Sequence, residues 1–123
     1  MVCLAVTYLV LPNREDEAVA LFQKLTKVTR AEPGCRMYLA HRSLAEPRRF
    51  FLYEQYDDDA ALQAHRQSLH FDELVQRGLF RIIENRTRHQ SKSILHRFFA
   101  FDFPAPRLEL ASRWRIIFMR LWS

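Results

Sequence analysis

Hydrophobic and polar positions divide the first third of the chain into a strand-like and a helix-like segment. Residues 2–11 (VCLAVTYLVL) are rich in β-branched and aromatic side chains and are followed by Pro12, a pattern that predicts a strand buried on both faces. Asn13 is a candidate N-cap, and Pro33-Gly34 is a stop signal. Between them the spacing predicts an amphipathic helix of about five turns, whose apolar face comprises Ala18, Leu21, Phe22, Leu25 and Val28.

Two further apolar segments predict a β-hairpin. Residues 35–43 alternate in polarity, and residues 50–56 (FFLYEQY) follow them after a turn that contains Pro47. The second of these strands is apolar on both faces of the pleat, whereas a sheet with one solvated face should alternate. We therefore expect its far face to be covered, most simply by a second copy of the chain in a symmetric homodimer.

A broken helical region and a fourth strand complete the pattern. The run Asp57-Asp58-Asp59 can cap a short helix that includes His65, and Ser68 is expected to interrupt it before helical character resumes over residues 70–76. Residues 79–88 predict the fourth strand. The order β-α-β-β-α-β predicts an α+β, ferredoxin-like fold with an antiparallel sheet and both helices on one face.

Composition changes near residue 90. The chain has 123 residues, of which 49% are hydrophobic and 27% charged, which indicates one globular domain. Residues 1–90 carry 13 basic and 12 acidic side chains, whereas residues 91–123 carry six and two, with both tryptophans and five of the ten phenylalanines. We expect a folded domain at 1–90, with no nucleic-acid partner, and a basic, aromatic tail at 91–123.

Within this tail, residues 108–122 are moderately amphipathic when they are placed on a helix. Such a helix can make peripheral contact with a membrane surface, or it can dock on its own dimer or on a partner groove. An extension without function is the third interpretation. The sequence leaves all three open.

Cysteine content and apolar run length indicate the compartment. Cys3 and Cys35 are too few for a secreted disulfide scaffold, and neither a signal peptide nor a membrane-spanning segment is evident. The expected location is the cytoplasm.

Three motifs carry a resemblance to a known family. They are Glu32-Pro33-Gly34-Cys35, the strand Arg49 to Tyr56, and the run Ala64-His65 followed by Ser68-Leu69-His70-Phe71. In this order and spacing they resemble the antibiotic biosynthesis monooxygenase domain, which includes small quinol monooxygenases. The likeness covers about residues 2 to 88 and implies dimeric α+β barrels with a cavity between sheet and helices in each protomer.

The resemblance also implies a reaction. Oxygenases of this family use O2 without flavin, metal or haem, so the chain is expected to be a cofactor-independent monooxygenase that oxidises a quinol-like or polyphenolic small molecule. Its partners would be this aromatic substrate, O2 and a second copy of the chain. Two other functions on the same fold stay open: a non-catalytic metabolite-binding or stress protein, and an isomerase or lyase for a small diketone or phosphorylated metabolite.

Three residues are the candidate proton-handling groups: Glu54, His65 and His70. Glu54 lies on an apolar strand, where burial should raise its pKa, and a structural bond to a backbone amide or to Arg36 is an equally weighted interpretation. His65 and His70 can approach each other only if the helix breaks at Ser68, and a bond from His70 to a backbone carbonyl is the alternative for that ring.

Four residues are expected to line the substrate pocket: Tyr56, Phe22, Phe71 and Leu52. Tyr56 shares a strand face with Glu54 because the two are two residues apart. Glu54, His65 and His70 also have the residue types of an iron site, yet nothing in the spacing makes them converge, so no metal is expected. Cys35 is expected to be a buried, inert thiol.

Overall fold

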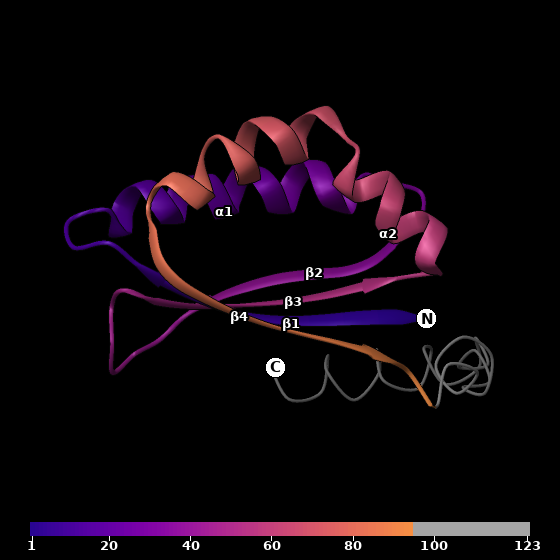
Figure 1. Cartoon of the computed structure of the whole chain (residues 1–123), viewed down its shortest axis with the longest axis horizontal. Helices are drawn as coiled ribbons and strands as arrows, with labels where there is room; N and C mark the ends of the chain where they lie inside the picture. Colours follow the sequence, from indigo (N-terminus) through magenta and orange to yellow (C-terminus); the bar gives the residue numbers. More distant parts are fainter. Residues whose placement is uncertain (95–123) are drawn as a thin grey trace, which may run out of the picture. The chain divides into compact units, whose positions relative to one another are not determined.

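The computed structural model describes residues 1–94, and the expected order β-α-β-β-α-β is confirmed in it (Figure 1). The helix expected over residues 108–122 lies outside the described residues. The elements are β1 (Val2–Val10), α1 (Glu15–Arg30), β2 (Cys35–Arg42), β3 (Arg49–Tyr56), α2 (Asp59–Arg66), the π-helical turn η1 (Phe71–Gln76), the 3-10 turn η2 (Leu79–Arg81) and β4 (Ile83–Lys92).

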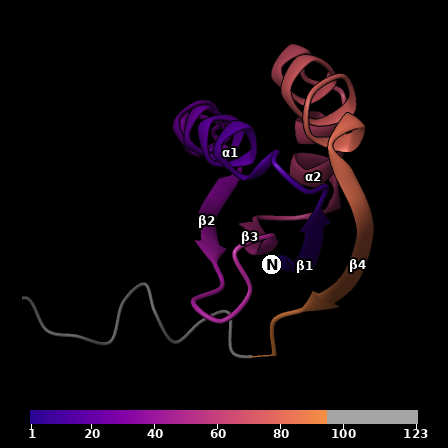
Figure 2. The ribbon, with the colours of Figure 1, turned by 90° about the vertical axis from the view of Figure 1, so that its left-hand side faces the viewer.

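The four strands form one antiparallel sheet in the order β2-β3-β1-β4. Both helices cover the same face of this sheet, with α1 above β2 in the view of Figure 2. This is the ferredoxin-like arrangement that the sequence predicts. No helix of the described part is long and apolar enough to cross a membrane.

Alternate residues of the central strands form the core under the helices. On this face Phe22 of α1 contacts the rings of Tyr8 on β1 and Phe50 on β3, with centroid distances of 5.6 and 5.4 Å. The sequence predicts that β1 is buried on both faces, and this is correct only for Val2–Leu4. Farther along the strand, alternate residues are only half-buried: Ala5, Thr7 and Leu9.

The opposite face of the sheet is apolar and open in the described part of the chain. Phe51 of β3 is 40% exposed, and Tyr53 beside it is half-buried. The ring of His41 on β2 lies 6.0 Å from that of Phe51. The apolar character of both faces of β3, which the sequence indicates, is therefore real, and no described element covers this face.

The start of α1 differs from the prediction. Asn13 does not cap the helix; it adopts a left-handed backbone conformation with φ of 65°, which asparagine tolerates better than most residues. The chain turns there after Pro12, and Arg14 is the N-cap residue, without a side-chain cap. In the last turn of the helix Thr29 is buried and Val28, which the sequence places on the buried face, is exposed. The buried face of α1 is therefore rotated in this turn.

The second helical region breaks where the sequence predicts it. Asp58 caps α2 through a 2.8 Å bond from the Ala61 amide to its carboxylate. Ser68 then donates to the His65 carbonyl and accepts from the Phe71 amide, at 2.6 and 3.2 Å. These two bonds join the end of α2 to the π-helical turn η1.

The fourth strand begins later than expected. Residues 79–81 form the 3-10 turn η2, and β4 runs from Ile83 to Lys92, past residue 90. The reason is that Leu79 and Ile82 are both buried in the core. A spacing of three brings two side chains to the same side of a 3-10 turn but to opposite faces of a strand.

Candidate functional site

A small cavity lies between the sheet and the α2–η1 segment. Its volume is about 40 Å³, which is room for about three water molecules. The residues around it come from the helix-covered face of β1, β3 and β4 and from α2, η1 and η2: Leu4, Val6, Tyr8, Glu54, Leu62, His65, Arg66, Phe71, Val75, Phe80, Arg86 and Arg88. We refer to it as the sheet cavity.

Glu54 supplies a buried carboxyl group to the sheet cavity. Its side chain is 6% exposed, and its Oε2 accepts a 2.7 Å hydrogen bond from the Tyr56 hydroxyl. Desolvation raises the pKa of Glu54, while the Tyr56 bond and the charges of His65 and Arg66 oppose this rise. The alternative bond to Arg36 is not formed, because Arg36 pairs with Asp57 at the surface.

Three arginines line the same cavity as this carboxyl group. Arg66, Arg86 and Arg88 all line the sheet cavity. Nη2 of Arg66 is buried and has no hydrogen-bond partner among the described residues, whereas the Arg86 guanidinium stacks on the Phe80 ring at 4.3 Å. An unpaired buried donor is costly, so the cavity is suited to an anion or an acceptor oxygen beside Arg66.

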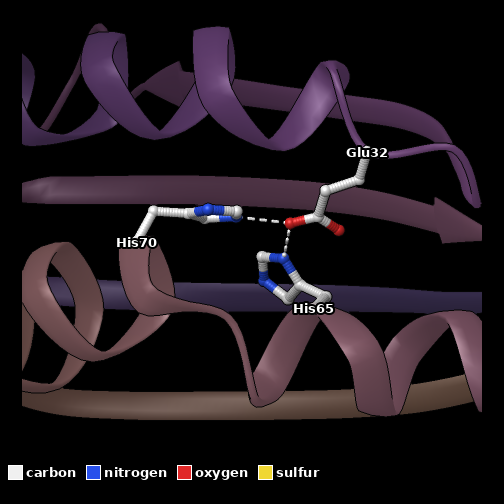
Figure 3. A group of neighbouring side chains, drawn as sticks. All are labelled: Glu32, His65 and His70. Atoms are coloured by element: carbon white, nitrogen blue, oxygen red, sulfur yellow. Dashed lines mark hydrogen bonds and ion pairs between the residues drawn. The ribbon is translucent and has the colours of Figure 1, made fainter.

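A second carboxylate, from Glu32, joins the two candidate histidines (Figure 3). Its Oε1 accepts a 2.8 Å bond from Nδ1 of His65 and a short bond from Nε2 of His70. His65 is 2% exposed, Glu32 16% and His70 24%. His70 thus bonds a side-chain carboxylate, and the alternative bond to a backbone carbonyl is not formed.

The break between α2 and η1 explains why the two histidines meet. Five residues on an unbroken helix would turn their side chains about 140° apart. The turn at Ser68 removes this separation, and the two imidazole centroids lie 5.9 Å apart. Three rings pack around His65, with centroid distances of 5.2 to 6.2 Å, namely those of Tyr56, Tyr38 and Phe71.

Glu32 is the site residue that sequence reasoning missed. The residue lies just beyond the end of α1, 33 and 38 positions before its two partners. Its presence in the Glu-Pro-Gly-Cys motif was the available signal. The carboxylate that converges with His65 and His70 is this one and not Glu54, and the three ligand atoms all lie within 4.8 Å of one another.

The four residues expected to line a pocket lie in different places. Phe71 lines the sheet cavity, Tyr56 lies behind Glu54 with no exposed surface, and Leu52 is packed in the core. Phe22 lines a separate groove of about 370 Å³ between α1 and the β2–β3 edge, together with Val19, Gln23, Thr26, Ala40, His41, Arg42 and Phe50.

Comparison with known proteins identifies the family. Residues 1–77 match the family model for antibiotic biosynthesis monooxygenase. The candidate monooxygenase YcnE of Bacillus subtilis is 30% identical over 78 residues, which is 63% of this chain and 82% of that protein. The uncharacterized protein sll1783 of Synechocystis is 33% identical over 67 residues, 54% of this chain, and the match spans less than half of its length, 46%.

Solved structures agree with the sequence comparison. The crystal structure of PA3566 from Pseudomonas aeruginosa superposes with a TM-score of 0.70 and 28% identity, over 76% of this chain and 93% of that one. The family model, the fold and the order of the three motifs therefore lead to one conclusion: the chain belongs to the antibiotic biosynthesis monooxygenase family.

Proposed function

We propose that this chain is a monooxygenase that oxidises a small, quinol-like phenol with O2, using electrons from the substrate itself and no cofactor. The observation that carries this proposal is that three groups line one cavity: the buried carboxyl group of Glu54, the buried imidazole of His65, and the guanidinium group of Arg66, one nitrogen of which has no partner within residues 1–94. We place the activity in the cytoplasm, since both cysteines are free thiols.

The first step is removal of the phenolic proton. Because Nδ1 of His65 faces a carboxylate, which only accepts, this nitrogen carries the hydrogen of the neutral ring and Nε2 is left as a base. Glu32 thereby orients His65 as the carboxylate of a catalytic dyad orients its histidine. Glu54, with a pKa raised by burial, is the second proton acceptor in the cavity.

The second step uses the resulting phenolate. The Arg66 guanidinium stabilises its oxygen, and the electron-rich ring then transfers electrons to O2 and forms a C–O bond with it. Loss of water gives a hydroxyquinone: one oxygen atom of O2 remains in the product and the other leaves as water. A quinol supplies all four electrons, so no external reductant is required.

The size of the sheet cavity sets a condition on this proposal. A volume of about 40 Å³ admits water or O2 but not an aromatic ring. The larger α1 groove is not a substitute, because Phe50 at its wall precedes Glu54 by four strand residues, about 13 Å. Substrate entry therefore requires that side chains lining the cavity move aside.

We also propose that the functional unit is a homodimer. The open sheet face with Phe51, Tyr53 and His41 is apolar, and a second copy would bury it with one self-complementary patch. Sedimentation of the full chain should give the mass of a dimer, and Phe51→Glu should shift it to a monomer. A monomeric wild-type chain would refute this part.

Oxygen uptake tests the activity. Full-length protein treated with EDTA is mixed with a menadiol-type hydroquinone, and O2 consumption and hydroxyquinone formation are followed. His65→Gln and Glu54→Gln should each lower kcat by about 10²-fold or more, and Arg66→Met should do the same. Glu84→Gln, at an exposed ion pair with Arg48, is the matched control.

Folding of each variant is checked by circular dichroism. No O2 uptake above the uncatalysed rate by the wild type, across several quinols, would overturn the proposal. So would unchanged turnover in all three cavity variants.

The charged residues of the cavity favour one alternative to the monooxygenase activity. Three arginines and one glutamate among the residues that line the cavity would suit a phosphorylated metabolite, so an isomerase for such a compound is the second candidate. Conversion of a phosphorylated diketone without O2 consumption would distinguish it from the monooxygenase. A non-catalytic binding protein would show saturable binding and neither reaction.

A further inference from the structure

Two imidazoles and one carboxylate converge at the edge of the sheet cavity. Nδ1 of His65, Nε2 of His70 and Oε1 of Glu32 all lie within 4.8 Å of one another (Figure 3). They come from three separate segments: the end of α2, the residue before η1, and the turn after α1. We propose that these three residues bind a divalent transition-metal ion, and that Zn2+ is the ion that suits them best.

The donor set determines this choice. Two histidines, one carboxylate and an open position are the ligands of catalytic zinc sites, and imidazole favours such ions over Mg2+ or Ca2+. Three rings crowd His65, which disfavours six ligands and favours four. Glu32 and His70 are partly exposed, so the site is open to solvent on their side, and a water molecule can be the fourth ligand there.

Metal binding requires all three ligand atoms to shift. Bonds of about 2.0–2.1 Å in a tetrahedron place ligand atoms about 3.3 Å apart. The Glu32 oxygen is 2.8 Å from His65 Nδ1 and closer still to His70 Nε2, so it must retreat by at least about 0.5 Å while the ion takes the place of the shared hydrogens. In addition, Nδ1 of His65 and Nε2 of His70, which lie up to 4.8 Å apart, must approach each other by up to about 1.5 Å.

The local backbone is a second observation in favour of a built site. Ser68 ends α2 with bonds to the His65 carbonyl and the Phe71 amide, and the chain continues as a π-helical turn. Such turns are rare and concentrate at functional sites. Here the turn has a definite effect, because it directs His65 and His70 to the same carboxylate.

Zinc titration of the full chain tests the proposal. Untagged protein is stripped of metal with a chelator, and Zn2+ is added in a calorimeter. We expect one ion per chain, and Zn2+ should also raise the Tm of the wild type. Co2+ in place of Zn2+ should show the intense visible absorption of a four-coordinate site. Glu32→Gln, which keeps the size and a hydrogen-bonding group, should weaken binding at least about tenfold.

Matched variants separate this site from adventitious binding. His70→Gln should act like Glu32→Gln and serves if that variant does not fold, whereas His89→Gln and Glu84→Gln, at exposed positions on β4, should bind like the wild type. Absence of saturable Zn2+ binding, or equal binding by all four variants, would overturn the proposal. It does not rest on the proposed oxygenase activity, since every readout is made without substrate. A zinc ion on Nδ1 of His65 would place the hydrogen of that ring on Nε2, so the zinc-bound form would lack the base of the oxygenase proposal.

Discussion

The hydroxyl of Tyr56 donates a hydrogen bond to Oε2 of Glu54, two residues earlier on the same strand, over 2.7 Å. Both side chains are buried on the helix-covered face of the sheet. The bond favours the ionised carboxyl group, while burial favours the neutral one, and burial is the larger effect on the pKa of Glu54. The stability of the fold near this pair should therefore depend on pH.

Tyr56→Phe removes this hydrogen bond and leaves the buried carboxyl group without its donor. We expect the free energy of unfolding to fall by about 1–3 kcal/mol, with a greater loss at pH 8 than at pH 5, because the bond to an ionised carboxylate is stronger. Urea unfolding at both pH values measures the difference. Tyr53→Phe, whose hydroxyl accepts from Gln55, should show no such pH dependence. An equal loss at both pH values for Tyr56→Phe would contradict this account.

Glu54→Gln should become relatively more stable as pH rises. The folded pKa of Glu54 is raised, so the folded state keeps its proton longer than the unfolded chain, whose carboxyl titrates near about 4.3. Wild-type stability is therefore lost as pH rises from that value through the folded pKa, and the glutamine variant escapes this loss. Unfolding free energies of both proteins between pH 4 and 8 test the sign, and a difference that is flat or falls with pH would show it to be wrong.

Gly34 is required by the close approach of α2. A Cβ atom at this position would lie 2.4 Å from the Cβ of Ala61, although the backbone of Gly34 has no positive φ. Gly34→Ala should cost about 1–3 kcal/mol of unfolding free energy through this overlap. When Ala61→Gly is added, the double variant should lose less unfolding free energy than the sum of the losses of the two single variants. Ala60→Gly, at an exposed position of α2, should give no such rescue. Thermal or urea unfolding of the wild type, the three single variants and the two double variants completes both cycles.

Cys35 should react slowly with alkylating reagents. Burial and the charge of Glu32 raise its pKa to about 11, so the reactive thiolate is scarce at pH 8. In a Cys3→Ala background, where Cys35 is the remaining thiol, iodoacetamide should modify the folded protein roughly 100-fold more slowly than the urea-unfolded chain. The rate should still be rising at pH 10. Equal rates in the folded and unfolded protein would mean that the thiol is free and exposed.

Features that depend on neighbouring residues could be predicted from the sequence. The apolar character of both faces of β3 and the helical spacing of α1 are local patterns, and the Asp58 cap and the Ser68 break act within a few residues. That Glu54 and Tyr56 share a face also followed from the period of a strand. The predicted Asn13 cap and the predicted start of β4 are wrong. The turn geometry after Pro12 determines where α1 begins, and the burial of Leu79 in the turn η2 determines where β4 begins.

By itself, then, the amino-acid order determined the kinds of secondary structure, their succession and the apolar sheet face, because these follow from local spacing and from the need to bury one side of each element. Only the tertiary structure decided that Glu32 bonds His65 and His70, that one Arg66 nitrogen has no partner in the described part of the chain, and that the cavity beside Glu54 is small. These depend on which side chains meet across the sheet and how tightly they pack, and local periodicity contains no information on contacts between residues more than 30 positions apart.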